Sequence, residues 1–164
     1  MRFSLIDRIT ELHEGDRITA VKVLTLAEEY LKDHFPRFPV MPGVMMLEAL
    51  FQASSWLVRK SEDFEHSVVV LREARNTKYS DFVEPGQTLT VTAQIIKQDE
   101  STTTLKAQGL VGDRVAVSSR LVLERYNLAD RYPERAASDE FTRRRFRRRF
   151  AILYQPAMLS ETTG

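Results

Sequence analysis

Alternation of hydrophobic and polar positions dominates the chain and predicts several strands. Residues 17–27, RITAVKVLTLA, carry Ile, Val and Leu among Thr, Lys and Ala after a turn at residues 14–16, which predicts a strand. Further β-branched runs cover residues 67–75, 87–98, 101–111 and 114–125. Short polar turns at 99–100 and 112–113 join the last three runs, so we expect them to be antiparallel neighbours. Residues 76–86, NTKYSDFVEPG, indicate one more short strand, closed by a Pro-Gly turn.

One stretch departs from this alternation. Residues 28–42 contain Pro36, Pro39 and Pro42, which remove backbone donors and favour extended neighbours, so we expect a short turn and then a rigid loop. From Gly43 the run VMMLEALFQASSWLVRK predicts a helix of about four to five turns that ends near SEDFEH. This helix is apolar nearly all round, which predicts that it is buried.

The order of these elements indicates the fold class. One buried helix followed by a run of antiparallel strands is typical of an α+β fold in which a single curved sheet wraps the helix. A length of 164 residues suits one domain, or one domain and a tail.

Composition excludes several kinds of chemistry. The chain has no cysteine, so it has no disulfide, thiol nucleophile or thiolate metal site, and this composition fits a reducing cytoplasm. No window of about 20 apolar residues is present, and the charged N-terminal stretch lacks the apolar core of a signal peptide. We therefore expect a cytoplasmic protein without a membrane span.

The composition shifts at Asn127. Residues 127–164 contain eight arginines and five acids, a net charge of +3, whereas the net charge of +1 for the whole chain leaves −2 for residues 1–126. We therefore expect a folded domain over 1–126 and a basic C-terminal extension over 127–164 that is partly helical or disordered.

The segment FTRRRFRRRF in this extension has an apolar stripe. Phe146, Phe150 and Leu153 are spaced i, i+4, i+7, so a helix would carry them on one face with arginines beside them. Three interpretations stay open. The first is a solvated, partly disordered tail, and the second is a docking patch for an acidic carrier protein or another acidic surface. The third is binding to nucleic acid or anionic lipid, although nucleic acid is not among the partners that we expect.

The predicted helix contains one acid and one amide in an apolar run. Glu48 and Gln52 are spaced i, i+4 and so share a helix face, with Ser55 near it. A buried carboxylate without a charged partner favours its protonated form, which a general acid requires. The alternative is that this face is the exposed stripe of the helix.

Two further features surround the start of that helix. His34 lies in the proline-stiffened loop, which is a rigid support for a catalytic imidazole, although an ordinary surface or core histidine is the alternative. Pro42 and Gly43 open the helix, whose free N–H groups favour an oxygen that gains negative charge. A plain turn glycine is the alternative for Gly43. Base, acid and oxyanion donors together suit proton abstraction α to a carbonyl.

Metal chemistry is not expected. His13 and His66 lie in polar stretches and are interpreted as surface residues. With three scattered histidines and no cysteine, we expect no metal site and no other cofactor.

The residues of this region resemble a known family. The segment HFPRFPVMPGVMMLEALFQAS is similar to the signature of the FabZ/FabA-type β-hydroxyacyl-[acyl-carrier-protein] dehydratases, which is close to HFPxxPxxPGVxxxEAxxQ. The matching positions are His34, Phe35, Pro36, Pro39, Pro42, Gly43, Val44, Glu48, Ala49 and Gln52. The stretches LIDRITELHEGDRITAVKVLT and FVEPGQTLTV also resemble this family, so the similarity runs from about Leu5 to Glu124.

The resemblance implies a fold, a reaction and an assembly. It implies the hot-dog fold, a curved antiparallel sheet around a long central helix, for residues 1–126. The implied reaction is the dehydration of β-hydroxyacyl-acyl-carrier-protein to the trans-2-enoyl product in fatty acid biosynthesis, catalysed by a hydro-lyase without a cofactor. The implied partners are acyl carrier protein and further copies of the chain, as a homodimer or a trimer of dimers.

The resemblance also implies roles for single residues. His34 would take the Cα proton, and Glu48 would help the β-hydroxyl leave as water. A backbone N–H at Gly43 or Val44 would polarise the thioester carbonyl, and Gln52 would orient Glu48 or its water. In the family, His and Glu of one site come from two chains. Glu48 favours the FabZ branch, because the FabA branch usually has Asp there and also isomerises its product.

The chain departs from the family pattern in places. The common HFPGHP is HFPRFP here, so Arg37 and Phe38 leave the substrate preference open, and the Arg-rich extension lies outside the family core. Two alternatives to the dehydratase also remain. One is a hydratase or thioesterase of the same fold that acts on coenzyme A thioesters, and the other is a non-catalytic module that binds acyl carriers.

Overall fold

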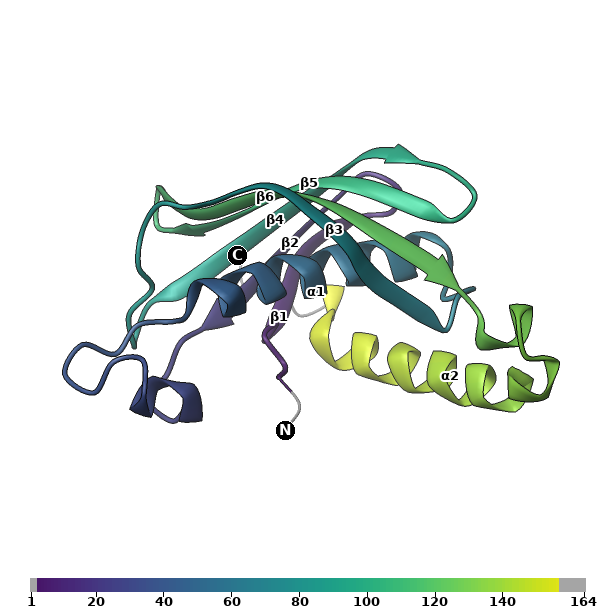
Figure 1. Ribbon diagram of the computed structural model, residues 1–164, viewed down its shortest axis with the longest axis horizontal. Coiled ribbons are helices and arrows are strands. Elements are labelled where there is room, and N and C mark those ends of the chain that lie inside the picture. Colours follow the sequence, from purple (N-terminus) through teal and green to yellow (C-terminus); the bar gives the residue numbers. More distant parts are fainter. Residues whose placement is uncertain (1–2, 157–164) are drawn as a thin grey trace.

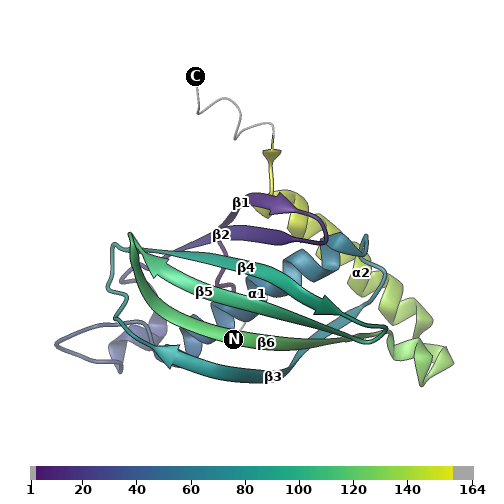
Figure 2. The ribbon, with the colours of Figure 1, turned by 90° about the horizontal axis from the view of Figure 1, so that it is seen from above.

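A six-stranded antiparallel sheet curves around one long helix in the computed structural model, which describes residues 3–156 (Figures 1 and 2). The strands are β1 Arg8–His13, β2 Arg17–Val23, β3 Val68–Tyr79, β4 Thr88–Gln98, β5 Thr102–Val111 and β6 Arg114–Tyr126. The helices are η1 Glu29–Lys32, α1 Gly43–Ser61, η2 Leu128–Asp130, η3 Pro133–Arg135 and α2 Ala136–Leu153. The predicted α+β class, with a sheet that wraps a buried helix, is confirmed.

The sheet has the order β1-β2-β4-β5-β6-β3, and its paired strands are antiparallel. The short polar turns predicted from the sequence join β4 to β5 and β5 to β6, as expected. β1 and β3 form the two edges.

One predicted strand does not exist as a separate element. The short strand expected at 76–86 is partly the end of β3, which continues to Tyr79, while residues 80–87 are irregular. Asn76 adopts a left-handed φ of 52°, and the pairing of β3 with β6 shifts between Arg75 and Lys78. A bulge of this kind lets a strand bend without ending, so the end of one long strand was interpreted as a separate short strand.

Helix α1 is as long as the sequence predicts, and it packs against the concave face of the sheet (Figure 1). Ala49, Leu50, Ala53 and Leu57 are fully buried along the side that meets the sheet. The opposing strands supply the other half of the core with Leu89, Val91, Leu105, Ala107, Ala116, Val117, Leu121 and Leu123. The spacing of the four helical residues is that of one helix face, and this face is buried.

Helix α2 packs against α1 on the side away from the sheet (Figure 1). Phe146 lies edge-on to Trp56 at 5.6 Å between ring centroids, and Phe150 contacts Phe64 at the same separation. Phe150 and Leu153 are buried. The predicted apolar stripe is therefore a packing surface, and residues 136–153 are an ordered helix rather than a solvated tail.

Asp139 anchors the start of α2. Its buried carboxylate accepts hydrogen bonds from the Ser67 hydroxyl and from the backbone N–H groups of Leu128 and Ala129, the last two at 3.0 and 2.8 Å. These bonds tie the helix to the start of β3 and to the chain that follows β6. The division into a domain over 1–126 and an extension over 127–164 stays a prediction, and residues 157–164 lie outside the described part.

Candidate active site

The loop that carries His34 is held by backbone hydrogen bonds. The Val40 N–H donates to the carbonyl of His34 at 3.0 Å, and Phe35 and Phe38 exchange two N–H···O bonds of 3.1 and 3.0 Å. At the far end, the Met41 N–H donates to the carbonyl of Val83 at 2.9 Å. The His34–Phe35 peptide bond is cis. The rigid loop that the prolines predict is therefore a closed turn tied to the β3–β4 connection.

The imidazole of His34 makes a hydrogen bond that defines its tautomer. Nδ1 lies 2.9 Å from the backbone carbonyl oxygen of Val40, and the ring is partly buried. A carbonyl oxygen can only accept, so Nδ1 must carry a proton. In the neutral ring Nε2 is then the unprotonated nitrogen, which is the form that a general base requires.

Arg37 and Phe38 occupy the exposed side of this turn. The Phe38 ring packs edge-on against Phe82 at 5.7 Å between centroids, and both rings are about half exposed. Phe35 stacks on His34 and is also half exposed. The two residues that depart from the family pattern thus add an exposed aromatic group and a cation beside the proposed base.

The N-terminus of α1 presents free backbone donors. Pro42 precedes the helix without a side-chain cap, and its carbonyl accepts from the N–H groups of Met45 and Met46. The N–H groups of Gly43 and Val44 therefore have no partner within the helix. A Cβ on Gly43 would lie 3.0 Å from the ring of Tyr79, so glycine lets this end of the helix lie against β3.

Glu48 and Gln52 are linked as their spacing predicts. The Gln52 Nε2 donates to Glu48 Oε1 at 3.0 Å and to the carbonyl of Phe3 at 3.0 Å, while its Oε1 accepts the Leu5 N–H at 2.8 Å. Gln52 therefore holds Glu48 and also fastens the N-terminal segment to α1. The Glu48 side chain is half-buried rather than fully buried.

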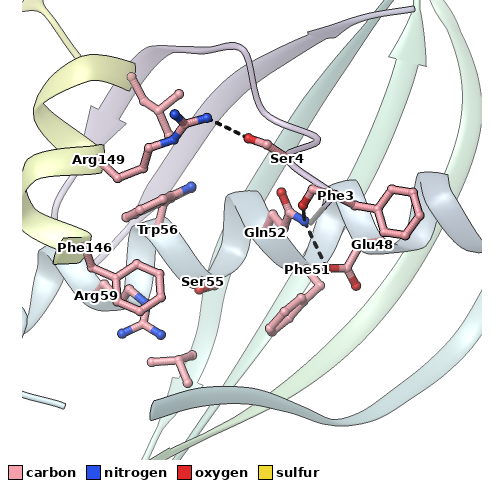
Figure 3. Close-up of a pocket in the computed structure, with 12 residues that line it drawn as sticks. Phe3, Ser4, Glu48, Phe51, Gln52, Ser55, Trp56, Arg59, Phe146 and Arg149 are labelled. Carbon is pink, nitrogen blue, oxygen red and sulfur yellow. Dashed lines mark hydrogen bonds between the residues drawn. The ribbon is translucent and has the colours of Figure 1, made fainter. Parts of the chain in front are cut away.

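The face of α1 that carries Glu48 borders a cavity of about 450 Å³ (Figure 3). Its lining comprises Phe3, Ser4, Glu48, Phe51, Gln52, Ser55, Trp56, Arg59, Val69, Phe146, Arg149 and Leu153. The cavity lies between α1, α2, the N-terminal segment and β3. Neither interpretation of this face, full burial or an exposed stripe, is therefore right, because the face borders a partly open pocket.

The structure brings some of the predicted residues together and leaves others apart. Glu48 and Gln52 share the cavity, but His34 is not part of its lining. Within residues 3–156 the imidazole of His34 and the carboxylate of Glu48 share no hydrogen bond. A single chain thus holds the two predicted catalytic groups in separate places.

Two basic lining residues, Arg59 and Arg149, were missed from the sequence. Arg59 lies seven residues after Gln52, on the same helix face, and that spacing was an available signal. Arg149 reaches the cavity because α2 folds back, and its Nη2 donates to the Ser4 hydroxyl at 2.8 Å. No local pattern predicts that contact.

Nothing in the described residues forms a helix long and apolar enough to cross a membrane. Two exposed arginines of α2 have acidic partners: Arg147 pairs with Asp63 at 2.8 Å, and Arg144 pairs with Glu140.

Comparison of the fold with solved structures supports the hot-dog architecture. The dehydratase heterocomplex ApeI:P from Xenorhabdus doucetiae aligns with a TM-score of 0.63 over 77% of this chain and 85% of that chain, at 17% sequence identity. A mutant thioesterase from Pseudomonas aeruginosa, PA1618, aligns with a TM-score of 0.59 over 74% of this chain and 81% of that chain, at 16% identity. At such identities these likenesses concern the fold alone.

Comparison of sequences identifies relatives of higher identity. The chain is 40% identical over 116 residues to the 3-hydroxyacyl-[acyl-carrier-protein] dehydratase FabZ of Levilactobacillus brevis, covering 71% of this chain and 78% of the relative. The FabZ of Lactiplantibacillus plantarum is 39% identical over 116 residues, covering 71% and 79%. Residues 1–120 match the model of the FabA-like domain. The chain therefore belongs to the FabA-like family.

Proposed function

We propose that this chain converts a β-hydroxyacyl thioester of acyl carrier protein into the trans-2-enoyl thioester and water. The names of its relatives indicate this reaction for those proteins. The enzyme is a hydro-lyase of fatty acid biosynthesis. The tautomer of His34 carries the proposal, because the bond from Nδ1 to the Val40 carbonyl leaves Nε2 free to take a proton.

Each step of the reaction has a residue suited to it. Nε2 of His34 takes the Cα proton, and the electron pair of that bond forms the double bond. The β-hydroxyl leaves with a proton from Glu48, which Gln52 orients through its 3.0 Å hydrogen bond. The N–H groups of Gly43 and Val44 stabilise the negative charge on the thioester oxygen, since the start of α1 is uncapped and adds its dipole.

The proposal includes a homodimer, with further assembly into a trimer of dimers as the family resemblance implies. β3 is an edge strand of 12 residues, so one side of it is free to pair with a second copy. Tyr79 on this strand and Phe82 beyond it are about half exposed. Because His34 and Glu48 do not meet within one chain, we place the His34 loop of one protomer against the Glu48 cavity of its partner.

Absorbance of the enoyl thioester tests the reaction. Purified protein is incubated with β-hydroxyacyl thioesters of acyl carrier protein of several chain lengths, and with the same acyl groups on coenzyme A. We expect enoyl formation that is faster with the carrier-protein thioesters. Release of free thiol without enoyl would instead indicate a thioesterase, and no reaction with any thioester would refute the dehydratase.

A further inference from the structure

Arg59 is a buried cation without an acidic partner. Its side chain is 5% exposed, and it lines the cavity that also contains Glu48. Nη1 donates to the carbonyls of His66 and Ser67, each at 3.2 Å, and the guanidinium lies 3.7 Å from the centroid of the Phe146 ring. Within residues 3–156, Nε has no hydrogen-bond partner, Nη2 donates to none, and no carboxylate pairs with Arg59. Nη2 is therefore the donor that a ligand in the cavity could use, since Nε is buried.

The position of Arg59 relates it to the proposed acid. Glu48, Gln52, Ser55 and Arg59 follow one another at helical spacing along one face of α1, so Arg59 lies about 16 Å along the axis from Glu48. Figure 3 shows Glu48 and Arg59 at opposite ends of the row of lining residues. The cavity is thus acidic at one end and basic at the other.

Much of the wall between these ends is apolar. Phe51, Trp56, Val69, Phe146 and Leu153 all line the cavity, and two of them come from α2. An alkyl segment suits this part of the wall. An alkyl chain with an apolar tip would in turn cover Nη2 of Arg59 without giving it an acceptor.

We propose that the Arg59 end of the cavity is a binding subsite for a carboxylate at the far end of the substrate's acyl chain. This inference rests on the proposed function, because it takes the reacting end of the chain to lie at Glu48. A carboxylate would accept a charge-assisted hydrogen bond from Nη2, because Nε is itself buried from the cavity. α2 contributes to this subsite, since the Phe146 ring lies against the guanidinium. Burial lowers the pKa of Arg59 to about 10, which leaves it cationic at neutral pH.

A binding experiment tests the subsite without turnover. Trp56 is the single tryptophan of the chain and lines the cavity, so its fluorescence reports occupancy. The protein is titrated with a medium-chain fatty acid, with the primary alcohol of equal length, and with inorganic phosphate. We expect the acid to bind the wild-type protein at least about tenfold more tightly than the alcohol, as a hydrogen bond to a charged group implies. Equal binding of acid and alcohol overturns the proposal, and so does binding of phosphate in place of the acid.

Variants locate the carboxylate. In Arg59→Met, which keeps an apolar side chain beside Phe146, we expect the acid to lose its advantage over the alcohol. Arg148→Met is the matched control, since Arg148 is exposed on α2 and does not line the cavity, and it should keep the advantage. Loss of the advantage in Arg149→Met but not in Arg59→Met would place the carboxylate at the mouth of the cavity and overturn the proposal. Should Arg59→Met not fold, the comparison of acid with alcohol in the wild-type protein still tests the proposal.

A turnover experiment separates the subsite from the reaction itself. Wild-type protein should dehydrate an ω-carboxy-β-hydroxyacyl carrier thioester with a higher kcat/KM than the alkyl thioester of equal length, and Arg59→Met should reverse this order. A purely structural role for Arg59 would lower both values equally and overturn the subsite. No enoyl from either thioester would refute the proposed function, and the fluorescence titration would still decide the subsite.

Discussion

The Nδ1 atom of His34 lies 2.9 Å from the backbone carbonyl oxygen of Val40, in the turn that precedes α1. Because this bond leaves Nε2 as the basic nitrogen, we predict that His34→Ala lowers kcat/KM for dehydration at least about a hundredfold, the usual contribution of a general base. Enoyl absorbance measures the effect. His13→Ala is the control, because His13 is an exposed residue on β1 paired with Glu11. A similar loss in both variants would remove His34 from its role.

Glu48→Gln should also lose most of the activity, since an amide cannot supply the proton for the departing hydroxyl. If each site takes His34 from one chain and Glu48 from the other, mixing the two inactive variants should restore activity. A mixed dimer then has one site with both residues intact, so refolding an equal mixture should recover about a quarter of wild-type specific activity. No recovery, in a sample shown by mass spectrometry to contain mixed dimers, would place both groups of a site in one chain.

Gln52 should matter for stability as well as for activity. Its Oε1 accepts the N–H of Leu5, which is 1% exposed, so Gln52→Ala leaves a buried donor without a partner. We predict a loss of about 1–3 kcal/mol in the free energy of unfolding, measured by urea denaturation. Gln98→Ala is the control, because its hydrogen bond to Glu62 is exposed, and it should lose less than about 0.5 kcal/mol. Equal losses would mean that Leu5 finds another partner.

Much of this site follows from helical spacing, while the rest depends on contacts between distant segments. The hydrogen bond between Glu48 and Gln52 and the apolar stripe of α2 both come from residues three or four positions apart. Gln52 and Leu5 are 47 residues apart, and Arg149 and Ser4 are 145 apart. Such pairs are decided by how whole elements pack, and nothing in either local sequence specifies the partner. The continuity of β3 past Asn76 was missed for a related reason, since it depends on pairing with the distant strand β6.

The buried Asp139 should make the docking of α2 sensitive to acid. Burial opposes its charge, but the hydrogen bonds from Ser67, Ala129 and Leu128 and the nearby Arg143 outweigh burial and lower its pKa below the ordinary value of 3.8. A carboxyl with a lowered folded pKa stabilises the fold above the unfolded pKa, and this contribution is lost as the pH falls through the folded pKa.

We therefore predict that Asp139→Asn is less stable than wild type at neutral pH and that the difference shrinks below about pH 4. Urea denaturation at several pH values measures the difference, and Trp56 fluorescence reports release of α2. Glu140→Gln is the control, because Glu140 is exposed on the same helix, and it should show no such convergence. A stability gap for Asp139→Asn that is the same at every pH would contradict the role given to its charge.

The contact between Arg149 and Ser4 has a practical consequence for anyone who prepares this protein. It brings the N-terminal segment and the end of α2 together at one side of the cavity, and Phe3 and Ser4 line that cavity, so an affinity tag fused at the N-terminus would be attached a few residues from it. A tag there could compete with an acyl chain for the same apolar walls. Kinetic work should therefore compare tagged and tag-cleaved protein before any chain-length preference is assigned to the enzyme.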